Sequence, residues 1–99
     1  MTLIVPGDEL IMAGTSVDIG RGGMRVRTPS DVPPGHLVVL RFTLPQGERE
    51  LLVRGRVVLS FYDAAARSYT HGVAFTQYTP QDHEEIIRFV SAFEAVDSE

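Results

Sequence analysis

The chain has no cysteine, no lysine and no long apolar run. Without cysteine there is no disulfide framework and no thiolate chemistry, which fits a cytoplasmic protein. No segment approaches the ~20 apolar residues that a membrane helix needs. The start of the chain also lacks the basic segment and the longer apolar stretch of a signal peptide. We therefore expect a cytoplasmic protein that does not insert into a membrane.

The balance of charge excludes one large class of function. Nine basic residues, all arginine, stand against 13 acidic ones, and the net charge is −4. General binding of DNA or RNA needs a positive surface that displaces counterions, so we expect no nucleic-acid partner. Arginine is nevertheless the better side chain for phosphate and for guanine edges, although a GC-rich genome produces the same bias. The length of 99 residues, 43% of them hydrophobic, predicts a single domain over 1–99.

The segment from Val17 to Val26 organises the rest of the chain. Its two ends alternate apolar and polar residues, which predicts two strands. Between them lie three glycines and Arg21, in the order Gly20-Arg21-Gly22-Gly23. Glycine tolerates positive φ and lets the backbone approach a ligand or another strand closely. The loop therefore offers backbone N–H groups, the carboxylate of Asp18 and one guanidinium.

Further strands are predicted on both sides of this segment. Residues 10–19 contain one strand or two short ones, and alternation over 37–44, 51–61 and 69–78 indicates three more. Five or six antiparallel strands over about 3–78 imply a small barrel or sandwich. One amphipathic helix then covers about 80–96.

The predicted helix begins at Thr79, a good N-cap, with Pro80 in its first turn. Its apolar residues form one stripe, made of Ile86, Phe89, Val90, Phe93 and Val96. We interpret this stripe as core, with docking of Phe89 and Phe93 on a partner as the alternative. The acidic residues Asp82, Glu84 and Glu85 complement the helix dipole and are not read as catalytic carboxylates.

No catalytic or metal-binding pattern is present. The three histidines, His36, His71 and His83, fall in a loop, a strand and a helix start, at no spacing typical of metal ligands. The serines form no nucleophile elbow, and the glycine loop lacks the Lys-Ser/Thr pair of a P-loop. We therefore predict a non-catalytic protein without metal or cofactor.

The glycine segment resembles the second motif of PilZ domains, bacterial receptor modules for cyclic di-GMP. That motif reads Asp/Asn-x-Ser-x-x-Gly, and here Asp18 and Gly23 match while Gly20 replaces the serine. The similarity covers about residues 3–93. It extends to Pro33-Pro34-Gly35, Gly55-Arg56-Val57 and Gly72-Val73-Ala74-Phe75. It implies a six-stranded antiparallel β-barrel with one C-terminal helix.

The first motif of the family, Arg-x-x-x-Arg, has no counterpart before Arg21, so we expect that segment to lie upstream of this sequence. In the family those arginines clasp the phosphates and guanines. A hydrogen bond to a charged group contributes about 1.5–3 kcal/mol, so losing two arginines removes roughly 3–6 kcal/mol. At about 1.4 kcal/mol per tenfold, affinity falls by roughly two to four decades.

Three hypotheses for the function are open, the first two from this resemblance and the third from a different class. The first is a regulatory module of cyclic di-GMP signalling with weakened or lost nucleotide binding, acting on a protein partner of the motility or polysaccharide machinery. The second is a working cyclic di-GMP receptor. Its candidate ligand-binding residues are Asp18, Gly20, Arg21, Gly22, Gly23 and Arg25. The third is a structural domain that forms homo-oligomers. For Asp18, anchoring the loop through its backbone N–H groups is the alternative to ligand contact.

Overall fold

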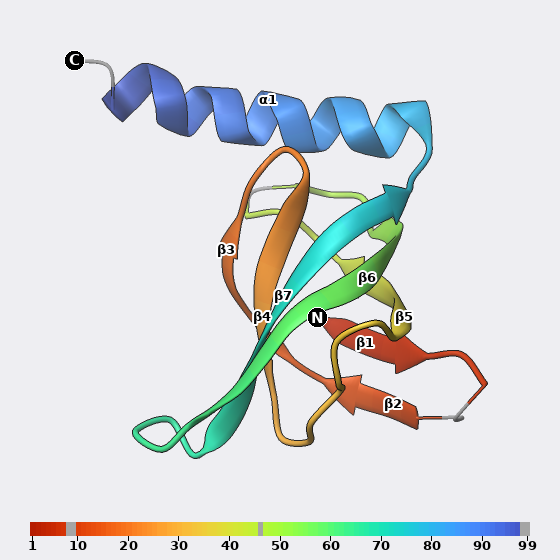
Figure 1. Ribbon diagram of the computed structural model, residues 1–99. Helices are drawn as coiled ribbons and strands as arrows, with labels where there is room; N and C mark the ends of the chain where they lie inside the picture. The colour runs from red at the N-terminus through yellow and green to blue at the C-terminus, as the bar shows by residue number, and fades with distance from the viewer. Residues whose placement is uncertain (8–9, 46, 98–99) are drawn as a thin grey trace.

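A curled antiparallel β-sheet and one C-terminal helix form the fold in the computed structural model (Figure 1). The structure describes residues 1–7, 10–45 and 47–97, with side chains described as far as residue 92. The elements are β1 (Thr2–Val5), β2 (Leu10–Ala13), β3 (Thr15–Ile19), β4 (Gly23–Thr28), β5 (Leu37–Phe42), β6 (Leu51–Asp63), β7 (Ser68–Gln77) and α1 (Pro80–Asp97). The strand order is β2-β1-β5-β6-β7-β4-β3. The predicted mainly β fold is confirmed.

The sheet has seven strands instead of the six expected, because residues 10–19 divide into two strands at Gly14. β2 pairs with β1 at one edge of the sheet, and β3 pairs with β4 at the other. A Cβ on Gly14 would lie 3.1 Å from the carbonyl oxygen of Arg27, so a side chain there would crowd the end of β4. The two edge strands of the curled sheet, β2 and β3, are therefore consecutive in the chain and are joined at Gly14.

Alternation along the strands decides which face is buried. In β4, Met24 and Val26 are buried, whereas Arg25 points outward. The same alternation buries every second residue of β5 and of the first half of β6. The core made this way contains Leu3, Val5, Met12, Met24, Val26, Val38, Leu40, Phe42, Leu51, Val53, Val57 and Val73. The alternation in the sequence therefore gives the buried face of β4, β5 and the first half of β6. It fails in the second half of β6, where Leu59 and Phe61 continue the same apolar alternation but are 49% and 46% exposed, beyond a register shift in the pairing with β7.

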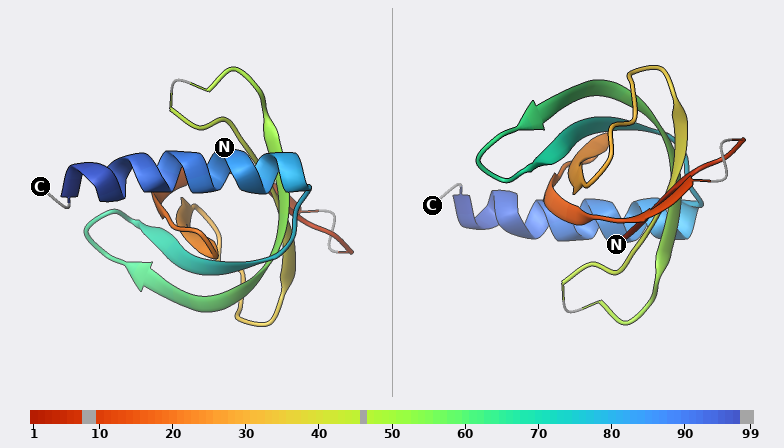
Figure 2. Two further views of the ribbon diagram at one scale, coloured as in Figure 1. Left: turned by 90° about the horizontal axis from the view of Figure 1, so that it is seen from above. Right: turned by 90° about the horizontal axis from the view of Figure 1, so that it is seen from below.

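Helix α1 lies across one end of the curled sheet and extends beyond it (Figures 1 and 2). Thr79 is its N-cap as predicted, because Thr79 Oγ1 accepts a hydrogen bond from the Asp82 N–H at 3.1 Å. Ile86 is fully buried, and Phe89 and Val90 pack partly buried against the core. The stripe is thus core over this part of the helix, while the side chains of Phe93 and Val96 lie outside the described residues.

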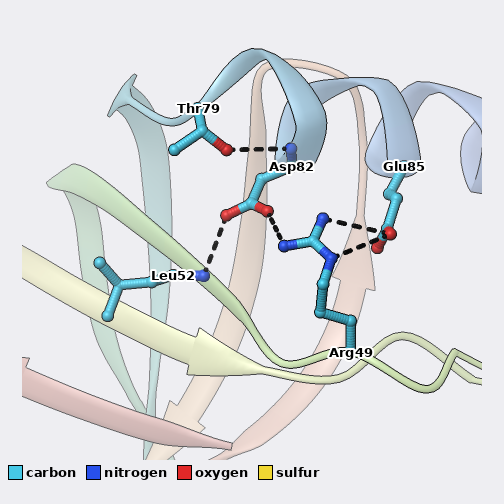
Figure 3. A network of polar contacts seen from close by, with 5 residues as sticks. All are labelled: Arg49, Leu52, Thr79, Asp82 and Glu85. Carbon is cyan, nitrogen blue, oxygen red and sulfur yellow. Dashed lines mark hydrogen bonds and ion pairs between the residues drawn. The ribbon is translucent and has the colours of Figure 1, made fainter.

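The first turn of α1 is tied to the segment before β6 (Figure 3). Asp82 is 4% exposed; its Oδ1 lies 2.6 Å from a terminal nitrogen of Arg49, and its Oδ2 accepts the Leu52 N–H at 3.3 Å. Glu85 Oε1 lies 3.1 Å from the other terminal nitrogen of Arg49. Besides standing in the first turns, where acidic residues complement the helix dipole, Asp82 and Glu85 therefore also fix the helix to the sheet.

His71 on β7 is fully buried in a short hydrogen-bonded chain. The hydroxyl of Thr28 donates to the Ser30 carbonyl at 2.7 Å, so it must accept from His71 Nε2, which lies 2.8 Å away. The Nε2 tautomer follows, and Nδ1 is buried without a hydrogen-bond partner in the described residues. Burial lowers the pKa of His71, outweighing the opposing effects of the Ser30 carbonyl and the Asp31 charge.

Because His71 is buried, we expect the free energy of unfolding of this domain to depend on pH. Because the folded-state pKa of His71 lies below its ordinary 6.5, the unfolded chain takes up a proton first as the pH falls. The stabilisation that the neutral His71 side chain contributes to the folded state is complete above the ordinary pKa and is lost as the pH falls below it. His71→Gln keeps a donor toward Thr28 but does not titrate. Urea unfolding of both proteins from pH 8 to 5 should show a shallower decline in the variant; parallel curves would contradict the prediction.

Candidate functional site

The glycine loop joins β3 to β4 at the end of the sheet covered by α1 (Figure 1). The Gly20 N–H donates to the Gly23 carbonyl at 2.8 Å, and the Phe75 N–H donates to the Gly22 carbonyl at 2.8 Å. The loop is therefore a tight hairpin that is also fixed to β7. Among the described glycines only Gly7 and Gly35 have positive φ, so these loop glycines are not explained by a left-handed backbone.

Gly23, the last glycine of the motif, is required for packing. A Cβ on Gly23 would overlap the carbonyl oxygen of Val73 and lie 3.4 Å from the Cα of Ala74. Gly55 on β6 approaches β7 from the other side. A Cβ on Gly55 would lie 2.8 Å from the Ala74 carbonyl oxygen. β7 therefore passes between two strands that approach it through glycine. Neither glycine needs a ligand to explain it.

Gly20 and Gly22 have a different environment. A Cβ on Gly22 would meet no atom within 4 Å, and the nearest atom to a Cβ on Gly20 is 3.9 Å away. Both positions therefore have room for a side chain. Gly20 stands where the family has serine, so the hydroxyl is absent although there is space for it.

Asp18 and Arg25 are brought together on the outer face of the sheet. They are cross-strand partners in the β3–β4 pairing, and Asp18 Oδ2 lies 2.9 Å from a terminal nitrogen of Arg25. Both side chains are more than half exposed, so the pair contributes at most about 1 kcal/mol. In the part of the chain that the structure describes, the carboxylate is thus held by a guanidinium, whereas the two roles considered from the sequence were ligand contact and anchoring of the loop through its N–H groups.

Arg21 points from the loop toward α1. Its terminal nitrogen donates to Ser91 Oγ at 3.3 Å, in an exposed contact between residues far apart in the sequence. The guanidinium of Arg21 is therefore engaged with the helix. Ser91 was not singled out from the sequence, because nothing in the pattern indicates how the helix lies relative to the loop.

A groove with a volume of about 800 Å³ lies beside β3 and beneath α1. We call it the β3 groove. One wall is formed by residues 14–19 and the other by residues 42–45, with Met1 between them. Met24, Phe89 and Val90 supply apolar surface from the core and the helix. The sequence did not reveal this groove, because its walls meet only when the sheet curls.

Among the described residues, no group of three or more histidine, aspartate and glutamate side chains is placed to hold a metal ion. In the same part of the chain, no helix combines the length and the apolar character that crossing a membrane requires.

The structure is thus a strongly curled antiparallel sheet, a half-barrel, covered at one end by a C-terminal helix with the glycine hairpin beneath it. The family model described as PilZ domain matches residues 2–92, and the chain therefore belongs to the PilZ domain family. PilZ domains are receptor and regulatory domains, and this chain is thus a PilZ-type module of cyclic di-GMP signalling.

Among solved structures, the chain is similar to the Bacillus subtilis inhibitor of motility, MotI/DgrA. The TM-score is 0.81 at 15% sequence identity, and the match covers 99% of this chain and 47% of that one. This chain therefore spans less than half the length of that protein. At this identity the likeness concerns the fold. The search of curated proteins found no match.

Proposed function

We propose that this domain is a regulatory module whose own binding of cyclic di-GMP is weakened or lost, and that it acts by contact with a protein partner. The observation that carries the proposal is that both arginines of the motif region are directed to protein groups. Arg21 donates to Ser91, and Arg25 pairs with Asp18. In addition, Gly20 offers no hydroxyl where the family motif has serine.

The direct test is calorimetry with cyclic di-GMP. A nucleotide that binds here must displace the Asp18–Arg25 pair or the Arg21–Ser91 hydrogen bond, or be held by backbone N–H groups alone. We expect no saturable heat below about 100 µM nucleotide, which corresponds to a micromolar site weakened by about two decades. Tight, stoichiometric heat release from this chain would refute the weakened-site proposal.

A gain-of-function variant sharpens this test. Gly20→Ser restores the hydroxyl of the family motif at a position with room for it. One added hydrogen bond of about 1 kcal/mol should raise the affinity for cyclic di-GMP roughly fivefold. Gly22→Ser, two residues along the same open loop, is the matched control and should leave the affinity unchanged. NMR titration at millimolar nucleotide measures both; equal affinities would remove the missing hydroxyl from the explanation.

The open space over Gly20 and Gly22 favours a second candidate, a working receptor that holds nucleotide on the loop backbone and through Arg21. In that case Arg21→Ala should abolish binding. Arg67→Ala is the control, because Arg67 lies in the β6–β7 turn, at the end of the sheet remote from α1 (Figure 1). Unchanged binding in Arg21→Ala would exclude this arginine from the site.

Exposed apolar side chains support action on a protein partner. The second half of β6 exposes Val58, Leu59, Phe61 and Tyr62, each between 46% and 59%. They lie on the part of the β6–β7 hairpin that projects from the sheet (Figure 1). The similar solved structure is that of an inhibitor of motility, which favours the motility machinery as the source of the partner.

A further inference from the structure

We propose that the outer face of β2, β1, β5 and the first half of β6 docks an acidic amphipathic helix of a partner protein. These strands are neighbours at one side of the sheet (Figure 1). We call their outward-pointing side chains, from residues 2–4, 11–13, 37–41 and 52–56, the docking face. The inference rests on the action on a protein partner proposed above, and it specifies the chemistry of that partner.

One row of the docking face is apolar across three strands. Ile11 lies opposite Ile4, and Ile4 lies opposite Val39. The residues that alternate with them along each strand face the core, so this row points outward. Ile11 is 68% exposed, and Ile4 and Val39 are partly exposed. Two strand spacings make the row about 10 Å wide, which is close to the diameter of a helix.

Exposed leucines extend this apolar row on both sides. Leu37 lies opposite Arg56, and Leu52 lies opposite Arg41, in the pairing of β5 with β6. The two leucines are 55% and 48% exposed. A single exposed apolar side chain is commonplace, whereas apolar side chains gathered in adjacent rows are typical of an interaction surface. The docking face therefore has the apolar character of a contact with another protein.

The charge of the docking face is opposite in sign to that of the chain. The chain has a net charge of −4, yet in the part that the structure describes the charged side chains of this face are all arginine. Arg41 is held by Glu50, whose Oε1 lies 2.8 Å from a terminal nitrogen of the guanidinium. Arg54 and Arg56 are exposed, and neither forms an ion pair with a described carboxylate. Both guanidiniums can therefore bind carboxylates of a partner through paired hydrogen bonds.

An amphipathic helix matches this combination of side chains. Its apolar stripe, with residues three and four apart, covers the row that contains Ile4. Asp or Glu along one edge of the stripe then lies over β6, because Arg54 is the next residue of the same row after Val39. DNA, RNA and anionic lipid fit less well. The net charge repels them, and each guanidinium here stands beside an apolar side chain instead of in a continuous basic surface.

NMR titration with two synthetic peptides tests the proposal. The probe is a capped peptide of about 20 residues, long enough to form a helix in water, with one leucine stripe, glutamate along one edge of it and alanine elsewhere. We expect the largest shifts at the amides of residues 2–4, 11–13, 37–41 and 52–56. A second peptide has glutamine in place of every glutamate. We expect it to bind about tenfold more weakly, because two exposed ion pairs are lost.

Variants of the protein separate the charged from the apolar part of the docking face. Arg54→Gln combined with Arg56→Gln should weaken binding of the glutamate peptide about tenfold, whereas Arg67→Gln, in the β6–β7 turn, should bind within twofold of the parent. Leu37→Ser should also weaken binding, and Val17→Ser is its control, since Val17 is an exposed apolar residue of β3. Circular dichroism checks that the variants are folded; where one is not, the peptide pair decides.

No binding at millimolar peptide, equal binding of both peptides, or shifts away from the docking face would overturn the proposal. Binding of vesicles rich in phosphatidylserine, or a concentration-dependent dimer that excludes the peptide, would assign the face to a membrane or to a second copy and would also overturn it. Calorimetry with cyclic di-GMP keeps the two proposals apart. Peptide binding together with tight nucleotide binding refutes only the weakened site, whereas absence of both refutes only the docking face.

Discussion

Replacing Gly23 with alanine should lower the free energy of unfolding by about 3 kcal/mol, the upper end of the usual cost of overpacking. The added methyl group would meet the Val73 carbonyl oxygen and the Ala74 Cα, both parts of the β7 backbone. A backbone held in a ladder on both sides cannot move aside as the end of a flexible side chain can. Urea unfolding followed by circular dichroism measures the change.

Gly22→Ala is the matched control for this substitution. It adds the same methyl group one residue earlier, where nothing lies within 4 Å, so its stability should change by no more than about 0.5 kcal/mol. Gly55→Ala should be destabilising for the same reason as Gly23→Ala. The two should not be additive, since both displace the same stretch of β7. Equal stability of Gly22→Ala and Gly23→Ala would show that β4 does not pack on β7 as described.

The strands and the helix of this fold could be predicted from the sequence, because each has its own local pattern of residues. Alternation marks the buried faces of β4, β5 and the first half of β6, and Thr79 followed by Pro80 marks the start of α1. The division at Gly14 was not decidable in this way. It depends on which strand lies on each side of residues 10–19, and that is set by the curl of the whole sheet.

The candidate site was only partly predictable, for the same reason. The motif places Asp18 and Arg25 on neighbouring strands, but their ion pair depends on the cross-strand register, in which the two residues lie opposite each other next to an irregularity in the pairing. The contact of Arg21 with Ser91 depends on where the helix crosses the loop. The local sequence pattern specifies which residues form the loop. Tertiary contacts decide which of their polar side chains are already bonded to other protein groups.

The attachment of α1 yields the second large effect. Asp82→Ala should destabilise the domain by about 2–3 kcal/mol, because the Leu52 N–H loses its acceptor and the first turn of the helix loses its link to Arg49. Arg49 is partly exposed and can be rehydrated, which limits the cost. Thermal and urea unfolding provide the measurement.

Glu84→Ala is the control, since it removes a carboxylate two residues along the same helix from an exposed position. Its cost should stay within about 0.3–1 kcal/mol, the range of a helix-dipole contribution. Asp82→Asn should lie between the two variants, because the amide oxygen can still accept the Leu52 N–H while the charge opposite Arg49 is lost. If Asp82→Ala and Glu84→Ala were equally stable, the dipole alone would account for both residues. The buried carboxylate would then not be what fixes the helix over the glycine loop and the β3 groove.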